Sequence, residues 1–336
     1  MRMCTSGGSG RFIFPASAVT DVWAALDGRL NAPTGSPQYP NLLDGYATRP
    51  PWYVAGVDYA VGPDSTTVFK DPNIDGVPAN CDIGPSWRVN VNGANVTLEN
   101  YDIGPTQATS AIYFWNGANN CVVRNCKIGF VQNQSGEVIS NLLFDKCIFD
   151  LTGLTDADWQ AAFFDSPNGV TFRYCHFKNA CSDFVQFNSS VTDPLFEYCL
   201  FDTAGVQAGK HPDYTQFLGG VAGTNGFRLR FCTSRQGAAA SGSQGFMCEL
   251  NAGTISGGEY AYNTFTPGSG QPNYFTGVTL SQLVGVFATH HNYYDESGAT
   301  VFAKGGGTDG APGDGDANTT YYSNVDMVTG LPGNND

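Results

Sequence analysis

Long apolar runs are missing from this 336-residue chain, and basic residues are few. No stretch approaches the roughly 18–20 apolar residues that a membrane-spanning helix needs. Lys and Arg number 16 against 30 Asp and Glu, which gives a formal net charge of −14. Because no basic stripe is present to neutralise phosphates, we expect neither a nucleic acid nor a membrane as a partner.

The start of the chain also lacks the apolar segment of a secretory signal. Its longest apolar run is Phe12-Ile13-Phe14, whereas such a signal carries roughly 7–15 apolar residues. We therefore expect either that a signal has been removed, or that the protein leaves the cell by another route, such as release within a virus particle. Both alternatives place the protein in a virion or outside the cell.

Glycine (42 residues) and aromatic residues (13%) are plentiful, whereas charged residues make up 14% of the chain. This composition is typical of many short strands joined by turns. One short pattern recurs on this background: alternating apolar positions, then a central residue that is mostly Cys or Asn, then another apolar residue. Subtracting successive positions gives spacings of 21 to 33 residues. The central residues, here called the ladder column, are Tyr101, Cys126, Cys147, Cys175, Cys199, Cys232, Asn263 and Asn292.

A repeat of this length predicts a solenoid, because one such unit is too small to bury its own apolar face. Strand-like composition and turn residues at the unit boundaries make each unit a β-coil. Stacked coils form an all-β parallel β-helix, in which equivalent residues lie about 4.8 Å apart. We expect an N-terminal cap or attachment segment over residues 1–50, including a short helix from Ser17 to Leu30. The β-helix is predicted over 51–300, with closing strands and a Gly/Asp-rich tail over 301–336.

The ladder column predicts small inward residues that fill a tight corner or bond its backbone. Ten cysteines also allow a disulfide framework. Stacked neighbours have parallel Cβ directions, which is poor geometry for a bridge. We therefore favour free, buried thiols, and an isolated bridge among the cysteines outside the column remains open.

A second repeat predicts a polar strip on the rod. Ser182-Asp183-Phe184-Val185-Gln186-Phe187 matches Pro212-Asp213-Tyr214-Thr215-Gln216-Phe217 at an offset of 30 residues, obtained by subtraction. One coil of offset would place Asp183 beside Asp213 and Gln186 beside Gln216. The adjoining coils add Gln160 to Asp165 on one side and Glu249 on the other. Candidate catalytic residues are Lys210, His211, Asp213, Asp183 and Glu249, and candidate substrate-binding residues are Tyr214, Gln216, Gln186, Phe184 and Trp159.

Such a strip suits a polysaccharide, because amides and carboxylates bond sugar hydroxyls and aromatic rings cover sugar C–H faces. For β-elimination on a uronate, Lys210 or His211 would be the base. A divalent cation such as calcium, held by Asp183 and Asp213, would neutralise the carboxylate. For hydrolysis, Asp183 with Asp213 would suit a retaining pair and Asp183 with Glu249 an inverting pair. The structural alternative is that the Asp and Gln side chains only bond one another along the stack.

Other charged residues are expected to be structural. Arg173, Arg228 and Arg230 flank the ladder column at outward positions, where ion pairs with Glu197 or Asp145 are predicted. We expect His176 at the surface or a corner, and His290 with His291 as a solvated pair.

The ladder column and its coils resemble the pectin-lyase-like superfamily of right-handed parallel β-helices over roughly residues 50–300. The resemblance implies that fold, but the superfamily includes lyases, glycoside hydrolases, epimerases, phage tailspikes and adhesins. The polygalacturonase-like set Asn-Thr-Asp, Asp-Asp, Gly-His-Gly and Arg-Ile-Lys is absent, as is a pectate-lyase Trp-Ile-Asp-His block.

The leading hypothesis is therefore a tailspike-like or depolymerase-like protein that recognises, and in the enzymatic case cleaves, a polysaccharide. Such viral β-helices usually form homotrimers, and the N-terminal segment would attach to a virion. The alternatives are a secreted bacterial polysaccharide lyase or glycoside hydrolase, and a non-enzymatic structural or decorating protein of a virus particle.

Overall fold

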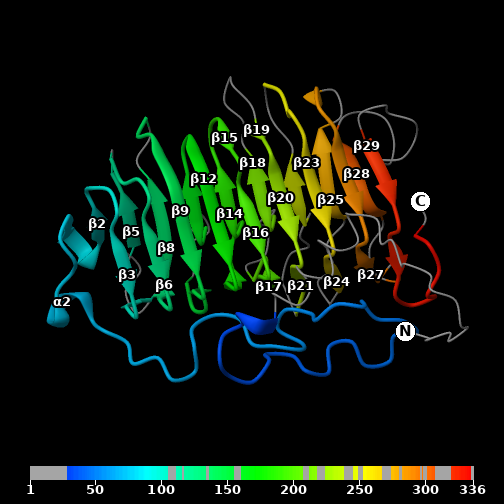
Figure 1. The fold of residues 1–336 in the computed structure, drawn as a ribbon, viewed down its shortest axis with the longest axis horizontal. Coiled ribbons are helices and arrows are strands. Elements are labelled where there is room, and N and C mark those ends of the chain that lie inside the picture. Colours follow the sequence, from blue (N-terminus) through cyan, green and yellow to red (C-terminus); the bar gives the residue numbers. More distant parts are fainter. Residues whose placement is uncertain are drawn as a thin grey trace, which may run out of the picture.

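The structure, a computed structural model, consists almost entirely of short strands stacked in three long sheets (Figure 1). Successive strands along the chain enter the three sheets in turn, so three strands and their turns make one coil of a right-handed parallel β-helix. The fold class predicted from the repeats is therefore confirmed. The structure describes residues 29–104, 111–115, 117–133, 136–154, 160–206, 212–217, 224–237, 245–248, 253–266, 274–279, 282–295, 297, 301–306 and 319–333.

The three sheets are named by their order within a coil. Sheet 1 contains β1 (Cys81–Ile83), β2 (Val89–Val91), β5 (Ala111–Phe114), β8 (Phe130–Asn133), β11 (Ala162–Phe164), β14 (Val185–Phe187), β18 (Thr215–Phe217), β22 (Phe246–Cys248), β25 (Tyr274–Thr279) and β28 (Val301–Gly306). Sheet 2 contains β3 (Thr97–Glu99), β6 (Val122–Arg124), β9 (Ile139–Asp145), β12 (Pro167–Arg173), β16 (Leu195–Glu197), β20 (Phe227–Arg230), β23 (Gly258–Ala261), β26 (Phe287–His290) and β29 (Thr319–Tyr322), with β15 (Val191–Thr192) and β19 (Thr224–Asn225) beside it. Sheet 3 contains β4 (Asp102–Ile103), β7 (Lys127–Ile128), β10 (Ile148–Asp150), β13 (His176–Ala180), β17 (Leu200–Ala204), β21 (Thr233–Arg235), β24 (Thr264–Thr266), β27 (Tyr293–Tyr294) and β30 (Val325–Asp326).

The corner between sheets 2 and 3 is built from two adjacent residues in each coil. The first adopts the left-handed conformation, with φ between 51° and 63°, which is uncommon for residues other than glycine. The second is the ladder residue, which points inward. The left-handed residues, here called the corner column, are Asn100, Asn125, Lys146, Tyr174, Tyr198, Phe231, Tyr262, His291 and Ser323.

The ladder column lies inside, as predicted. Its cysteine thiols are buried, and each donates to a carbonyl of the preceding coil or its own, as Cys175 Sγ does to Phe144 O at 3.4 Å. Cys4 lies outside the described residues, and the nine described cysteines are free thiols. The asparagines bond the corner backbone directly: Asn292 Oδ1 accepts from Asn263 N–H at 3.0 Å. Asn324 continues the column by one coil, since its Oδ1 accepts from Asn292 N–H.

The core is filled by aromatic side chains stacked coil upon coil. Phe144, Phe172 and Phe196 stack along sheet 2 with ring centroids 4.9 Å apart. Phe177 stacks on Phe149 and on Phe201 along sheet 3, at 4.8 and 4.7 Å. Identical residues recur because each strand position faces the same environment in every coil.

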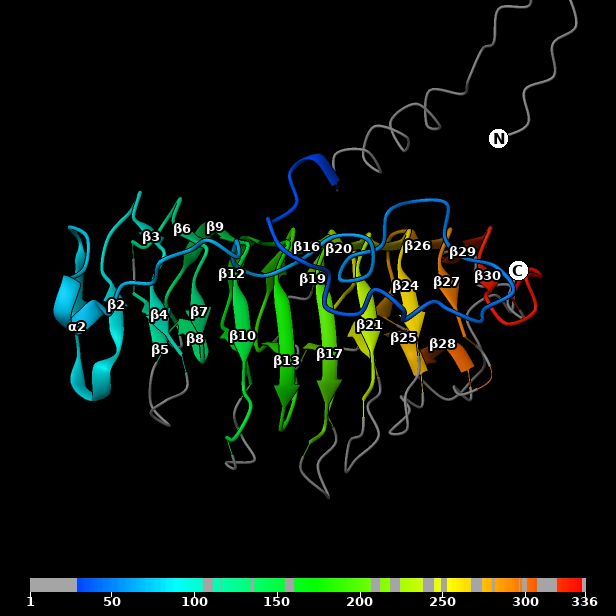
Figure 2. The same ribbon diagram turned by 90° about the horizontal axis from the view of Figure 1, so that it is seen from below.

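Residues 31–70, here called the strap, lie along the outside of the solenoid. They run from beside its middle coils to its last coil, and from there back to its first (Figure 2). The strap is anchored at several points by backbone hydrogen bonds. Those that mark its course are Thr48 N–H to Met327 O, Gly62 N–H to Tyr174 O, and Lys70 N–H to Asn100 O, at 3.2, 2.7 and 2.7 Å.

Aromatic rings of the corner column hold the strap in place. Tyr174, Tyr198, Phe231 and Tyr262 stack with successive centroid distances of 5.1, 5.3 and 4.9 Å. Trp52 of the strap packs edge-on against Phe231 and Tyr262. The strap and this stack therefore form a second apolar core outside the solenoid.

Residues 31–50 of the predicted N-terminal segment belong to the strap. The strap lies along the side of the stack and does not cover its end, because its aromatic residues find their partners in the corner column. The N-terminal end is closed by α2 (Pro72–Asp75), the 3-10 turn Pro85–Trp87 and β1, which pairs antiparallel with β2. The last coil extends past residue 300 to β30. Most of the predicted helix 17–30 lies outside the described residues. Among the residues that the structure describes, no helix is long and apolar enough to cross a membrane.

Candidate functional site

Outward side chains of sheet 1 form one row across successive coils, because parallel pairing puts equivalent positions opposite one another. The register pairs Tyr113 with Gln132, Gln132 with Phe163, Phe163 with Gln186, and Gln186 with Gln216. We call these five residues the amide–aromatic row. The strand residues on either side of each member are buried, which leaves the row as the outer surface of this sheet.

The row is only partly open to solvent. Gln186 is buried and the other members are half-buried. Gln160 Nε2 donates to Gln186 Oε1 at 2.6 Å, so one amide of the row is held by a neighbour. The Arg88 guanidinium lies 4.4 Å from the centroid of the Tyr113 ring and covers one of its faces. Phe163, Gln132 and Gln216 are the members most available to a ligand.

Two carboxyl groups flank the row on the side where the chain enters sheet 1. Asp183 Oδ1 accepts a hydrogen bond from Asp213 N–H at 2.8 Å, which places these residues in adjacent coils as predicted. The predicted neighbours Gln186 and Gln216 are likewise confirmed as partners in register. Asp183 is 3% exposed and Asp213 is 1% exposed. The expectation that Asp213 and Asp183 line an open groove is therefore wrong, since both side chains are buried.

This burial changes the acidity of Asp183. Removal from water disfavours the carboxylate and raises the pKa of Asp183 to about 7, although the hydrogen bond from Asp213 N–H acts in the opposite direction. A carboxyl group whose pKa lies near neutrality can both give and take a proton under physiological conditions. Strongly shifted groups of this kind are candidates for functional residues.

The two predicted sugar-stacking rings next to these carboxyl groups lie in the core. Phe184 packs against Phe177 and Phe201, and Tyr214 packs against Phe201 and Phe246. Both rings are buried and neither offers a face to a sugar. They stand at the corner between sheets 3 and 1, directly before β14 and β18, and their rings complete the aromatic packing of the core.

Four predicted site residues, Lys210, His211, Glu249 and Trp159, lie outside the described residues. Within the described ranges, no three His, Cys, Asp or Glu side chains are grouped so that they could hold a metal ion. The cation expected at Asp183 and Asp213 stays a prediction.

Tyr113 and Gln132 were not identified from the sequence, and Phe163 was included only within the segment Gln160 to Asp165. Each occupies the strand position that Gln186 and Gln216 occupy, within the segments AIYF, FVQN and AFF. Aligning the strand that precedes each ladder unit would have revealed this column, since its members alternate with buried apolar residues.

The histidines and arginines outside sheet 1 mostly serve the fold. His176 begins β13 directly after the corner between sheets 2 and 3, which is one of its two predicted positions, but it is buried there, with Nε2 3.8 Å from Asp202 Oδ2. His290 is also buried, and its Nε2 is 2.9 Å from Glu259 Oε1, so the predicted solvated pair is wrong for this residue. His176 lies on sheet 3, where strap residue Gly62 packs beside it. His290 lies on sheet 2, where its ring stacks on Tyr322. The predicted ion pair of Arg173 with Asp145 is confirmed at 3.1 Å.

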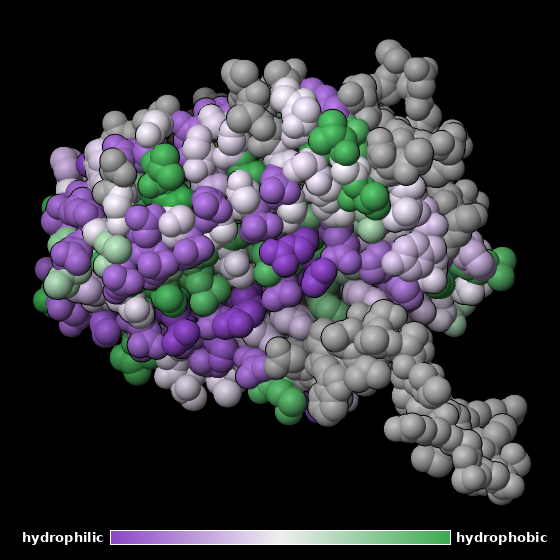
Figure 3. Space-filling view, turned by 45° about the horizontal axis from the view of Figure 1, so that its top comes forward, coloured by the Kyte–Doolittle hydropathy of each residue, from purple (hydrophilic) through white to green (hydrophobic). Residues whose placement is uncertain are grey.

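The face of the solenoid shown in Figure 3 is largely hydrophilic, and its apolar residues form small separate groups. Comparisons of the chain with models of protein families, with curated proteins and with solved structures found no match.

Proposed function

We propose that this protein binds a polysaccharide along the outer face of sheet 1. The observation that carries the proposal is the in-register amide–aromatic row. An extended polymer can follow such a row over several coils, with amides for its hydroxyls and a ring for its C–H faces. The row repeats at the strand spacing, so it offers similar contacts to successive parts of a chain-like ligand.

Asp183 supports a catalytic extension of this proposal. With its pKa raised to about 7, Asp183 can give or take a proton near neutrality, and a catalytic role requires that a bound sugar displace the neighbours that bury this carboxyl group. Asp213 in the next coil would be the second carboxyl group of a hydrolase. In a lyase, the base would come from Lys210 or His211, which directly precede Pro212-Asp213. We infer a protein of the tailspike or depolymerase type within the pectin-lyase-like superfamily, located in a virion or outside the cell.

Binding is tested with a panel of immobilised polysaccharides and purified protein. Gln216→Ala and Phe163→Ala should each weaken binding about tenfold, as expected when a ligand loses a ring or amide contact. Asn168→Ala is the matched control, because Asn168 is exposed on the neighbouring sheet 2. A site on sheet 1 would be contradicted if all three variants weakened polysaccharide binding equally, or if no variant weakened it.

Cleavage is tested on the polysaccharides that bind, by following reducing ends and the ultraviolet absorbance of the unsaturated product of elimination. Asp183→Asn and Asp213→Asn should each lower turnover by about 10²-fold or more, the scale of a lost acid or base. Lys210→Ala should do the same in a lyase. Turnover that is unchanged in all three variants would remove catalysis from this site and leave binding alone.

A non-enzymatic particle protein is the second candidate, and the Gln160–Gln186 hydrogen bond favours it. If the amides of the row mainly bond one another, they stabilise the stack and need no ligand. In that case the unaltered protein would bind no polysaccharide in the panel, and Gln186→Ala would lower the unfolding temperature.

A further inference from the structure

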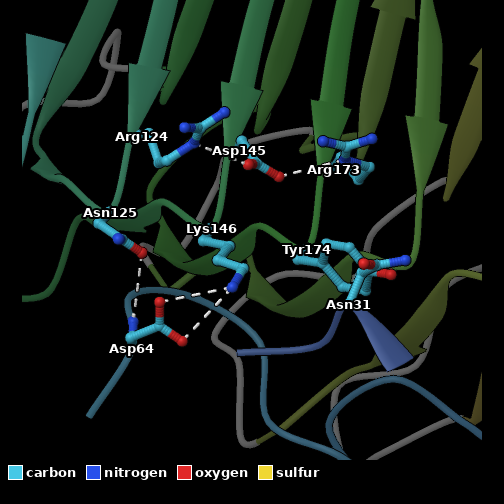
Figure 4. A pocket seen from close by; sticks show the side chains of 8 residues that line it. All are labelled: Asn31, Asp64, Arg124, Asn125, Asp145, Lys146, Arg173 and Tyr174. Carbon is cyan, nitrogen blue, oxygen red and sulfur yellow. Dashed lines mark hydrogen bonds and ion pairs between the residues drawn. The ribbon is translucent and has the colours of Figure 1, made fainter. Parts of the chain in front are cut away.

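A polar pocket lies between the strap and the corner of sheets 2 and 3, on another part of the solenoid from the amide–aromatic row. Its volume is about 360 Å³, within the usual range for small-molecule sites. Six lining residues come from the solenoid and two from the strap (Figure 4). The lining residues are Asn31, Asp64, Arg124, Asn125, Asp145, Lys146, Arg173 and Tyr174.

Two arginines form one wall of the pocket and share a single carboxylate. Arg124, Asp145 and Arg173 are opposite one another in register on β6, β9 and β12. Each arginine donates through Nε to a different oxygen of Asp145, both at 3.1 Å. Their side chains remain 41% and 40% exposed. Within the part of the chain that the structure describes, no other ion pair engages either guanidinium, so the terminal nitrogens of both can still donate.

Lys146 supplies the third positive charge, from the corner column. Its Nζ lies 3.4 Å from Asp64 Oδ2 of the strap, and both side chains are about one-fifth exposed. Asp64 is held in place by Thr34 N–H, which donates to Oδ1 at 2.7 Å. Among the lining residues, three cationic groups therefore face two carboxylates. Glu99 and Glu197 stand in register beside Arg124 and Arg173, outside the lining.

The polar character of the pocket is a local exception along the corner. In later coils the corner column carries stacked aromatic rings, and strap residues such as Trp52 pack directly on them. At Asn125 and Lys146 the column is polar and the strap leaves a hollow. The opening thus coincides with the coils in which the corner column carries polar side chains in place of aromatic rings.

We propose that this pocket binds a small oxyanion carried by a hydrophilic ligand, held by Arg124, Arg173 and Lys146. Guanidinium groups present paired donors that match carboxylate and phosphate oxygens. The Asn125 Oδ1 accepts from Asp64 N–H at 3.4 Å, and its Nδ2–H groups can donate to hydroxyl groups beside the anion. A carboxylated sugar and a phosphate share this chemistry. The proposal is independent of the polysaccharide site on sheet 1, since no residue is common to the two.

The test is titration of the full chain with glucuronate, inorganic phosphate and glucose, followed by calorimetry and by the shift of the unfolding temperature. We expect saturable binding of glucuronate, phosphate or both, and none of glucose. Tighter binding of glucuronate identifies an acidic sugar as the natural source of the oxyanion, and tighter binding of phosphate identifies a phosphorylated ligand. Absence of saturable binding by both anions, or equal binding of glucose, would overturn the proposal.

Two variants at the Lys146–Asp64 pair should act in opposite directions. Lys146→Gln should weaken anion binding at least about fivefold, because it removes a donor and a charge. Asp64→Asn should strengthen it about twofold or more, because it frees Lys146 while keeping an oxygen for Thr34 N–H. If the pair were purely structural, the two variants would not change anion affinity in opposite directions. Changes in the same direction would overturn the assignment.

Arg173→Gln should weaken binding about as much as Lys146→Gln. Arg230→Gln is the matched control, because Arg230 lies in the same row of sheet 2 beyond the pocket and pairs with Glu259. Anion affinity should be unchanged in the control. Equal weakening in both arginine variants would point to the general charge of the protein instead of this pocket.

Discussion

Two regions of the solenoid each bury an aspartate, but they differ in the number of partners they give to its carboxyl group and in the direction of its pKa shift. On sheet 3, beneath the strap, Asp202 is 2% exposed and surrounded by partners. Arg235 Nη1 donates to its Oδ1 at 2.6 Å, Thr203 Oγ1 donates at 2.8 Å, and the Tyr39 hydroxyl of the strap donates to Oδ2. At the edge of sheet 1, Asp183 is equally buried but has a single hydrogen bond, from the Asp213 backbone.

The difference in partners sets the difference in acidity. Burial alone would raise the pKa of Asp202, but its contacts with His176, Tyr39 and Thr203 and the charge of Arg235 hold that pKa well below its usual range. Burial raises the pKa of Asp183 to about 7, because one hydrogen bond does not compensate for lost hydration. Asp202 is thus a structural charge that fastens the strap. Asp183 carries a cost to stability that function would explain.

The largest effect is expected at Asp202. Asp202→Ala should lower the free energy of unfolding by about 3–5 kcal/mol, because it leaves Arg235 and the Tyr39 hydroxyl without their shared acceptor. Asp102→Ala on the same sheet is the control, since its pair with Lys127 is exposed and should be worth about 1 kcal/mol or less. Denaturant unfolding measures both, and equal losses would show that burial does not distinguish the two carboxylates.

Replacing Asp183 should raise the free energy of unfolding, whereas replacing Asp202 should lower it. A folded pKa above the unfolded value means that the folded state binds more protons between about pH 4 and pH 7, so stability falls as pH rises through this window. Asp183→Asn keeps an oxygen for Asp213 N–H and removes the titration. It should stabilise the protein by about 2 kcal/mol or more at pH 8 and by almost nothing at pH 4.

Unfolding of both proteins at several pH values measures this difference. Parallel stability curves for Asp183→Asn and the unaltered chain would show that Asp183 is ionised in the folded state at neutral pH, which would remove it as a general acid. The Asp202 contribution behaves in the reverse manner, because its pKa is depressed. It is present above the unfolded pKa and is lost only as pH falls through the lower folded value.

A smaller effect is expected where the strap meets Asp202. Tyr39→Phe removes one donor to a buried carboxylate and should cost about 1.5–2 kcal/mol. Burial and Asp202 together raise the pKa of Tyr39 to about 12, so this bond persists throughout the physiological range. Tyr53→Phe is the control, since Tyr53 accepts from Arg29 at an exposed position of the same strap and should change stability by less than about 0.5 kcal/mol.

The sequence predicted the fold and part of the site because both depend on repetition. The ladder column fixes the coil, and the 30-residue offset correctly placed Asp183 beside Asp213 and Gln186 beside Gln216. The burial of Asp183 and Asp213 was not predicted, because a repeat gives the spacing of residues but does not show whether a side chain at a corner is buried. Phe184 and Tyr214 illustrate this, since the same aromatic residue suits a core or a sugar.

The strap could not be predicted from local patterns. Its contacts join residues that are far apart in the chain, such as Tyr39 and Asp202 with a separation of 163 positions. Nothing in the neighbourhood of Tyr39 specifies such a partner. The pocket was missed for the same reason, because Asp64 meets Lys146 only after the strap has folded back along the corner.

The smallest effect is expected at Lys178, which lies in register between Asp150 and Asp202 on sheet 3. Lys178 Nζ pairs with Asp150 at 3.3 Å, but both side chains are about one-third exposed. Burial tends to raise the pKa of Asp150, while its bonds to Thr152 and the charge of Lys178 lower it, with a net lowering. Solvent screening reduces what such a pair contributes, so Lys178→Gln should cost less than about 1 kcal/mol.

Salt separates this pair from the buried cluster beside it. In about 1 M salt the cost of Lys178→Gln should vanish, because exposed charges are screened over a few ångströms. The cost of Asp202→Ala should persist, since its lost hydrogen bonds lie beneath the strap. Unfolding measured at low and high salt checks both. If Lys178→Gln cost as much as Asp202→Ala at either salt concentration, the row of charges on sheet 3 would act as one network, and local partners would not explain why Asp202 and Asp183 differ.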